Sequence, residues 1–144
     1  MALIASFRDA LAEARPGGLS QAAARADEVA IAIVDTADAF LALRAEWNAL
    51  FARAGLPHQV FQSHAVLRHW AKHYLDARMR LCIVTARRGG RLVMVWPLVR
   101  QRRFGLVSLR FLGVPVAQYG DVLVERSGDE AALLKAGWDA VAKL

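Results

Sequence analysis

Hydrophobic and polar residues follow two different rhythms along this chain. Between residues 36 and 76 large apolar side chains recur every three or four positions, which is the spacing of one face of an α-helix. From residue 81 to 125 short apolar runs alternate with glycine-containing turns, which is typical of β-strands. Helical spacing returns after residue 127. Together with a strand-like run at 29–35, this order predicts an α+β fold whose mostly antiparallel sheet is flanked by helices.

Two helices are expected before the main run of strands. The first begins at Thr36, which can cap it, and stops near Gly55. Its apolar stripe consists of Phe40, Leu43, Trp47, Leu50 and Phe51. The second begins at Ser63, another candidate cap. Its stripe consists of Val66, Leu67, Trp70 and Tyr74.

Both ends of the chain have helical patterns. The first 28 residues are rich in alanine and amphipathic, which predicts a helical N-terminal extension (1–28) ahead of a domain over 29–144. Ser127 and Glu130 have the spacing of a capping box and predict a helix from about residue 128. Its stripe consists of Leu134, Trp138 and Val141. The helical pattern still continues at Leu144, so we expect the domain to be truncated, as a piece of a longer protein.

The strands expected after the first one lie at 81–86, 91–100, 106–113 and 121–125. The first two of these form a hairpin through Gly89–Gly90. Pro97 cannot donate to a ladder, so we expect its strand to be bulged there or to lie at an edge. Cys82 has no second cysteine to pair with and is expected to be a small buried hydrophobe.

Composition limits the classes of protein. The chain has 144 residues, 56% of them hydrophobic, which is enough for one domain with a real core. Its apolar runs are shorter than the ~18 residues that a membrane span needs, so we expect a soluble, cytoplasmic protein without one. The formal net charge is +6, and arginine supplies the excess. Few aromatic residues are interleaved with these arginines, so the charge alone does not favour a nucleic-acid partner.

Several stretches carry a family resemblance through their order and spacing. They are Glu46-Trp47-Asn48-Ala49-Leu50, Phe61-Gln62-Ser63, the hairpin strand and its continuation over 91–113, and QYGDVLVE at 118–125. In this succession residues 29–144 resemble the N-terminal half of CelD/BcsL-type proteins, a branch of the GNAT acyltransferase superfamily related to FemAB-like folds. The resemblance implies a GNAT-like half-domain.

The same resemblance implies a function and partners. The whole protein would transfer an acyl group from acetyl-CoA or another acyl-CoA to an amino or sugar-linked acceptor, in cellulose or exopolysaccharide biosynthesis. This chain would supply the acceptor-side surface and would be inactive alone. Its partners would be a C-terminal GNAT half or a partner subunit, and a small-molecule or saccharide acceptor.

One segment resembles the superfamily's phosphate-binding loop but departs from it. Residues 102–107 begin like the pattern [Gln/Arg]-x-x-Gly-x-[Gly/Ala], yet Val107 stands where a small residue is required. A strand is expected to follow, whereas phosphate binding uses the N-terminus of a following helix. We therefore expect no phosphate loop here, and acyl-CoA would bind to the other half.

The first candidate site residues belong to the segment Tyr119-Gly120-Asp121, and two more lie at the turn around Gln62. Asp121 could accept a proton from an attacking amine or hydroxyl, or it could only cap a turn. Tyr119 could hydrogen-bond or stack on a sugar or peptide acceptor, or pack with its hydroxyl in water. Gln62 could face a cleft or belong to a helix entrance. His64 could contact a ligand or lie solvated at the start of a helix.

Two further possibilities remain from the sequence. His69 and His73 share a helix face, but no third ligand is evident and the glutamate of the zinc-protease pattern is missing, so no metal is predicted. The arginine-rich hairpin 87–103 gives an alternative function, a non-catalytic binding or scaffold module for an anionic polymer such as RNA or an acidic polysaccharide.

Overall fold

The computed structural model describes residues 28–144 of the chain. The helical extension expected over residues 1–28 falls almost wholly outside that range. Among the described residues, no helix has the length and apolar character needed to cross a bilayer.

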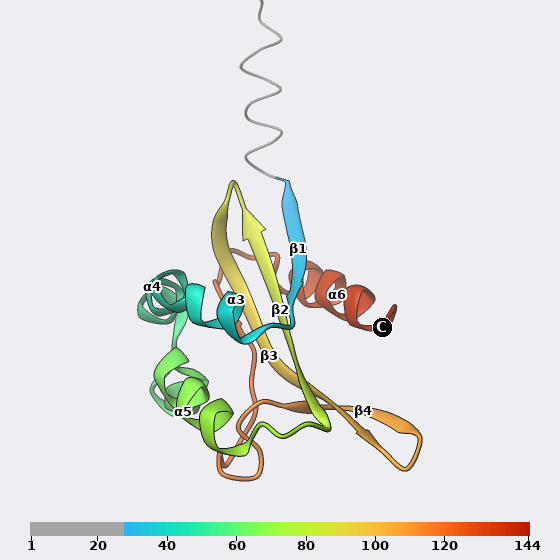
Figure 1. Cartoon of the computed structure of the whole chain (residues 1–144). Coiled ribbons are helices and arrows are strands. Elements are labelled where there is room, and N and C mark those ends of the chain that lie inside the picture. Colours follow the sequence, from blue (N-terminus) through green and yellow to red (C-terminus); the bar gives the residue numbers. More distant parts are fainter. Residues whose placement is uncertain (1–27) are drawn as a thin grey trace, which may run out of the picture.

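The centre of the structure is an antiparallel sheet in the order β1-β2-β3-β4, with a short strand, β5, paired to β3 (Figure 1). The strands are β1 (Val29–Val34), β2 (Met79–Arg88), β3 (Arg91–Arg103), β4 (Leu106–Phe111) and β5 (Leu123–Val124). All the recorded pairings are antiparallel, and the β2–β3 hairpin turns at Gly89 and Gly90 as predicted. The α+β prediction is therefore confirmed at this level.

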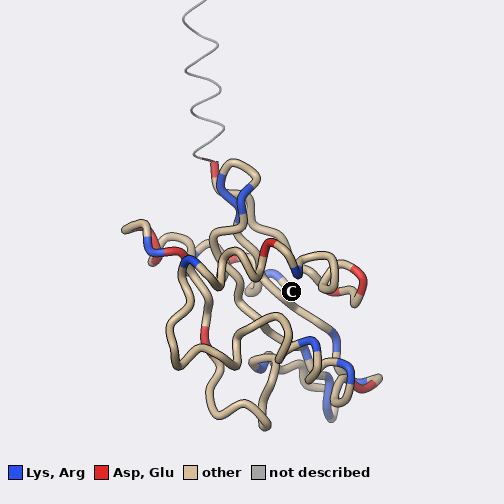
Figure 2. The backbone as a smooth tube through the Cα atoms, turned by 90° about the vertical axis from the view of Figure 1, so that its left-hand side faces the viewer, with Lys and Arg blue, Asp and Glu red and all other residues tan. Residues whose placement is uncertain are grey.

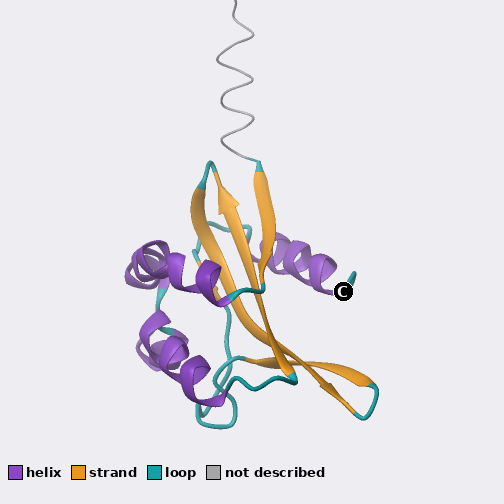
Figure 3. Ribbon diagram, viewed as in Figure 1, coloured by secondary structure: helices purple, strands orange, loops and turns teal. Residues whose placement is uncertain are grey.

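Helices cover both faces of the sheet (Figure 3). One face carries α3 (Ala37–Ala42), α4 (Arg44–Ala54), the 3-10 helix η1 (Pro57–Gln62) and α5 (His64–Tyr74). The opposite face carries α6 (Glu130–Val141). Two separate clusters of buried apolar residues result, one under the α3–α5 layer and one under α6.

The larger core follows the predicted stripes closely. Trp47, Leu50 and Leu67 have no exposed surface, and the Thr36 hydroxyl accepts a hydrogen bond from Ala39 N at 3.3 Å. The helix expected from Thr36 to Gly55 is, however, divided at Leu43, which ends α3 and precedes α4. On α5 the stripe is narrower than expected, because Val66 and Tyr74 are exposed.

The stripe predicted for the last helix is correct at Val141, but it is wrong by one position at Leu134 and Trp138. The buried residues of α6 are Leu133, Gly137 and Val141, whereas Trp138 is 59% exposed. A Cβ on Gly137 would lie 3.0 Å from Met94 Cε, so the absence of a side chain lets this face of the helix approach the sheet. The capping prediction also shifts, because Asp129 and not Ser127 occupies the N-cap.

Pro97 corrects a further prediction. It lies on β3, which has neighbours on both sides, and the register shift of the β2–β3 pair falls between Ala86 and Arg87. The Pro97 carbonyl accepts from Leu112 N at 2.9 Å, so the position that lacks an N–H faces the β4 side. On this side of β3, the pairing with β5 extends only to Val95 and the pairing with β4 begins only at Leu98. Pro97 therefore lies between the two ladders. The proline therefore removes no hydrogen bond from the β2 ladder.

The β3–β4 hairpin, residues 98–111, projects from the lower end of the sheet away from the helices (Figure 1). Residues 102–110 are all exposed. In contrast, Cys82 on β2 is buried as predicted, and this burial raises the pKa of its thiol.

Candidate functional site

Two segments distant in sequence meet at the site predicted from the residues: η1 lies against residues 118–122, which we call the junction. Gln62, at the end of η1, is 1% exposed, and its Nε2 donates to the carbonyl oxygen of Tyr119 at 3.1 Å. The backbone carbonyl of Gln62 accepts from Trp47 Nε1 at 2.9 Å. Gln62 therefore fixes the junction to the helical core.

Asp121 is half-buried at the other end of the junction, and both of its carboxylate oxygens have partners. Gln59 Nε2 donates to Oδ2 at 2.6 Å, and the backbone N–H of Val122 donates to Oδ1 at 2.8 Å. The second bond is the turn-stabilising role that was the alternative for this residue. The first bond orients the carboxylate from a different element, and each oxygen keeps a lone pair for a further donor.

Gln59 is the residue of this site that the sequence did not indicate. Its side chain is 6% exposed, its Oε1 accepts from Leu56 N at 3.0 Å, and its Nε2 also approaches Val122 O at 3.5 Å. A glutamine two residues after Pro57 is consistent with capping of a helical turn. Nothing in that local pattern points to a partner 62 residues away.

Tyr119 presents its side chain at the surface of the junction. The residue is 54% exposed, and its hydroxyl donates to Gln118 Oε1 at 3.2 Å. Its ring packs edge-on against Phe61 with 6.2 Å between centroids. One ring contact and one hydroxyl bond leave much of the side chain accessible, which suits stacking on a sugar or hydrogen bonding to it.

The backbone at the junction is held close to the sheet by Gly120. A Cβ built on this residue would lie 2.0 Å from Phe111 Cγ, a separation that cannot occur without movement. The chain therefore passes directly against the Phe111 side chain, and this contact sets the height of Tyr119 and Asp121 above β4. Glycine is required here for close approach.

His64 occupies a different environment from either of those predicted. It is 1% exposed, so the solvated alternative is wrong. For the same reason we do not assign its side chain to a substrate-binding surface. Its Nε2 lies 3.0 Å from Phe40 O, and its ring packs against Phe40 and Trp47. Burial lowers the pKa of the imidazole, and the charges of Arg68 and Arg44 act in the same direction, opposing the hydrogen bond to Phe40.

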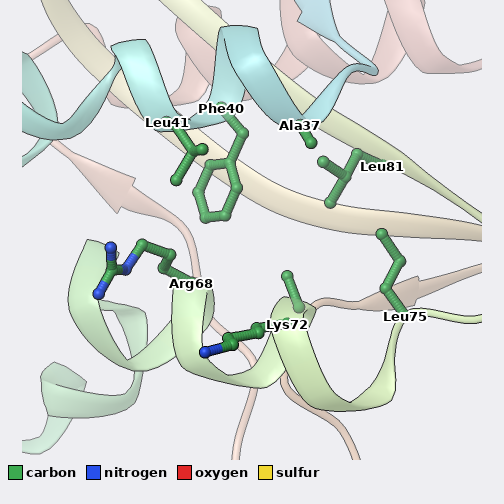
Figure 4. Close-up of a pocket in the computed structure, with 8 residues that line it drawn as sticks. Ala37, Phe40, Leu41, Arg68, Lys72, Leu75 and Leu81 are labelled. Carbon is green, nitrogen blue, oxygen red and sulfur yellow. The ribbon is translucent and has the colours of Figure 1, made fainter.

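A separate hollow of about 310 Å³ lies between α3 and α5 and contains none of the predicted site residues (Figure 4). Phe40, Leu41, Leu75 and Leu81 form much of an apolar lining. Arg68 and Lys72 add two cationic side chains from α5. Its volume is at the small end of ligand pockets, and its lining matches a compact apolar molecule with an anionic group.

The other sequence motifs do not form sites of the kinds considered. The ring centroids of His69 and His73 lie 4.5 Å apart on α5. Within residues 28–144, however, no group of three His, Cys, Asp or Glu side chains could hold a metal ion. Residues 102–107 form the turn between β3 and β4, with Phe104 and Gly105 at positive φ. A strand follows that turn, as predicted, and so the superfamily's phosphate loop is not formed there.

The arginines of hairpin 87–103 fall into two groups, at opposite ends of the sheet. Near the turn, Arg87 pairs with Glu46, Arg88 with Asp129 and Arg91 with Glu125. Basic positions accompany this turn at the top of Figure 2 and gather again at the lower end of the molecule. The upper arginines are therefore neutralised by carboxylates and bind the hairpin to its own fold.

Comparison with protein-family models, with curated proteins and with solved structures found no match to this chain. The CelD/BcsL-type resemblance consequently stays a prediction from the sequence.

Proposed function

We propose that residues 28–144 form the acceptor-binding side of an acyltransferase with a GNAT-like fold of the CelD/BcsL type. The acceptor is an amine or a sugar-linked group. The antiparallel sheet with helices on both faces supports the proposal at the level of fold class, and the sequence resemblance supplies the reaction type.

The observation that carries the proposal is the fixed carboxylate of Asp121 beside an accessible tyrosine. Gln59 and the Val122 N–H hold the two oxygens of Asp121 in place, at 2.6 and 2.8 Å. Tyr119, two residues earlier, offers a ring face and a hydroxyl at the surface. A positioned proton acceptor, with an accessible tyrosine two residues away that could stack on a sugar, is what we would expect of an acceptor site.

Acyl transfer from a thioester to an amine or a hydroxyl forms a C–N or C–O bond and breaks the C–S bond, so that the thiolate leaves and the acceptor releases one proton. In the proposed site a lone pair of the Asp121 carboxylate takes that proton, while Tyr119 orients the acceptor by stacking or hydrogen bonding. Gln62 keeps the junction backbone in register through its bond to the Tyr119 carbonyl. Since residues 102–107 form a strand–turn–strand, we assign no acyl-CoA site to the described part of the chain and derive no step through it.

The alternative of an anionic-polymer module on hairpin 87–103 is less well supported. Three of its arginines are paired with carboxylates of the chain itself, so the hairpin is not a continuous basic strip. A polymer that bound along its whole length would have to break these pairs.

The proposal is tested by titrating candidate acceptors into isotopically labelled protein and following the backbone amide resonances. Glucosamine, N-acetylglucosamine and a lysine-containing peptide are suitable probes. We expect one of them to shift the amides of residues 118–122 and of η1, and Tyr119→Ala to abolish the shift. Val116→Ser changes another exposed apolar residue, which is 57% exposed, and should leave the titration unchanged.

Two results would contradict the proposal. One is the absence of any shift at the junction with all three probes while the protein remains folded. The other is tight binding of acetyl-CoA in isothermal titration at physiological salt, because it would place a donor site in this chain.

A further inference from the structure

The tip of the β3–β4 hairpin exposes an apolar surface that contributes to neither core cluster. Phe104 is 89% exposed, Leu106 75%, Val107 51% and Leu109 39%. We call these four residues the apolar tip. Four large, exposed apolar side chains at the end of one projecting hairpin indicate an interaction surface, because single exposed apolar residues scattered over a surface are ordinary but such a concentration is not.

Arginines surround this tip. A hollow of about 430 Å³ on the hairpin's inner side is lined by Arg78, Arg80, Arg100, Arg102 and Val107, together with Ala77. Arg80 and Arg100 are direct cross-strand partners, and Arg102 N donates to Arg78 O at 3.1 Å. Like charges opposite each other destabilise a sheet, so the arrangement favours an external anion.

Within residues 28–144 no carboxylate forms an ion pair with these arginines. We call Arg78, Arg80, Arg100 and Arg102 the arginine collar. In the sequence, every charged residue from 77 to 120 is an arginine. Arg103 adds a guanidinium 5.0 Å from the centre of the Phe104 ring, which keeps a cation directly at the tip.

We propose that the β3–β4 hairpin docks on the surface of a bilayer that contains anionic lipids. The apolar tip enters the boundary between headgroups and acyl chains, and the arginine collar binds the headgroup phosphates. Guanidinium groups pair with phosphate oxygens through two parallel hydrogen bonds, and their alkyl stems can lie along apolar surface. Surface docking of this kind needs no membrane-spanning helix.

The composition of the tip favours lipid over nucleic acid. Base stacking needs aromatic or planar side chains, but three of the four tip residues are aliphatic. An apolar face bordered by cations is complementary to an interface that is apolar on one side and anionic on the other. The inference goes beyond the acceptor-side proposal, uses different residues and does not depend on it.

Flotation of the full chain with vesicles tests this inference. The vesicles are phosphatidylcholine alone or phosphatidylcholine mixed with phosphatidylglycerol. We expect flotation only with the mixed vesicles, weakening as salt rises because the collar's charges are screened. Arg100→Gln with Arg102→Gln should lower the apparent affinity by about tenfold or more.

The apolar tip is tested by Phe104→Asn with Leu106→Ser. Phe104 has φ of 51°, and asparagine tolerates that conformation well, so the turn should be retained. Binding to mixed vesicles should fall about tenfold, while circular dichroism and the melting temperature stay near those of the parent chain. Matched controls away from the hairpin are Val116→Ser and Arg126→Gln, both at exposed positions, and each should float as the parent does.

Several outcomes would overturn the proposal. Equal flotation with neutral and anionic vesicles would exclude a role for the collar, and an equal loss in the control variants would exclude a specific surface. Failure to float, with tight binding of free pyrophosphate or of an RNA oligonucleotide by the same arginines, would identify a soluble anion as the ligand instead. Loss of acceptor binding at the junction would leave the vesicle result unaffected.

Discussion

The side-chain amide of Gln59 donates to the carboxylate of Asp121 across 2.6 Å, joining η1 to the junction over 62 residues of sequence. The same side chain accepts from Leu56 N and lies 6% exposed. Gln59 therefore satisfies polar groups on both segments and also fixes the direction of the carboxylate. Removing it should affect both the stability of the fold and the geometry of the proposed acceptor site.

Gln59→Leu should destabilise the protein by about 1–3 kcal/mol, because it removes the partner of the partly buried Leu56 N–H and one partner of the Asp121 carboxylate. The free energy of unfolding from urea titration measures the loss. Gln118→Leu removes an exposed glutamine at the first position of the junction and should change stability by less than about 0.5 kcal/mol. Equal effects of the two substitutions would show that the Gln59 contacts do not stabilise the junction.

The elements of the fold were largely predictable because their signals are local. The three-to-four spacing of apolar residues within each helix identified the core faces, which include Trp47 and Leu50 on α4 and Leu67 on α5. The glycines at 89–90 identified the hairpin. Predictions failed where a distant partner decided the outcome. The rotation of α6 depends on how closely Gly137 approaches Met94, and the tolerance of Pro97 depends on which neighbour its missing N–H faces.

The site was predictable only in part for the same reason. Turn residues singled out Tyr119 and Asp121, and the Phe61-Gln62-Ser63 stretch singled out Gln62; the structure brings Gln62 against Tyr119. Gln59 was missed because its role is defined by a carboxylate far along the chain. That the collar arginines have no carboxylate partner within residues 28–144 was also hidden, since paired and unpaired arginines look alike in sequence.

Gly120→Ala should be among the most damaging small substitutions in the chain. Its new methyl group would meet Phe111 Cγ at 2.0 Å, and overpacking of this kind costs about 1–3 kcal/mol. We expect Phe111→Ala, which removes the Cγ and Cδ2 atoms that the new methyl group would meet, to relieve part of the clash, so that the double variant is more stable than the sum of the single effects predicts. A double-mutant cycle by urea unfolding measures this coupling. Strict additivity would mean that the junction does not press on the Phe111 ring.

The ion pair between Glu46 and Arg87 should contribute modestly to stability, in a pH-dependent way. Arg87 Nη2 donates to Glu46 Oε1 at 3.0 Å, and this hydrogen bond lowers the pKa of Glu46, against the opposing effect of burial. Because the pKa of Glu46 is lower in the folded state, its contribution to the free energy of unfolding is present at a pH above the ordinary carboxyl pKa. The contribution disappears as the pH falls through the folded-state pKa.

A double-mutant cycle with Glu46→Gln and Arg87→Gln should therefore give a coupling of about 0.2–1 kcal/mol near neutral pH, because the Glu46 side chain is 43% exposed. The coupling should shrink towards zero in acid. The pair of Lys135 and Asp139, whose side chains are 74% and 50% exposed, is the control and should couple more weakly. A coupling that is unchanged in acid would show that the Glu46 charge is not its source.

His64 should make the stability of the fold sensitive to mild acid. Burial lowers the pKa of the imidazole below its ordinary 6.5, so the unfolded chain binds a proton at a pH where the folded chain does not. The contribution of neutral His64 to the free energy of unfolding is therefore fully present above about pH 6.5. It is lost as the pH falls from there towards the folded-state pKa. The free energy of unfolding, measured from about pH 5 to pH 8, should show this slope.

His64→Gln isolates the effect, because the other histidines remain in both proteins. Glutamine can still donate to Phe40 O, with which the His64 ring nitrogen makes its 3.0 Å contact, but it does not titrate. The stability difference between parent and variant should rise with pH up to about 6.5 and then stay level. A difference that is constant over the whole range would mean that the buried imidazole takes up a proton as readily in the folded state as in the unfolded chain.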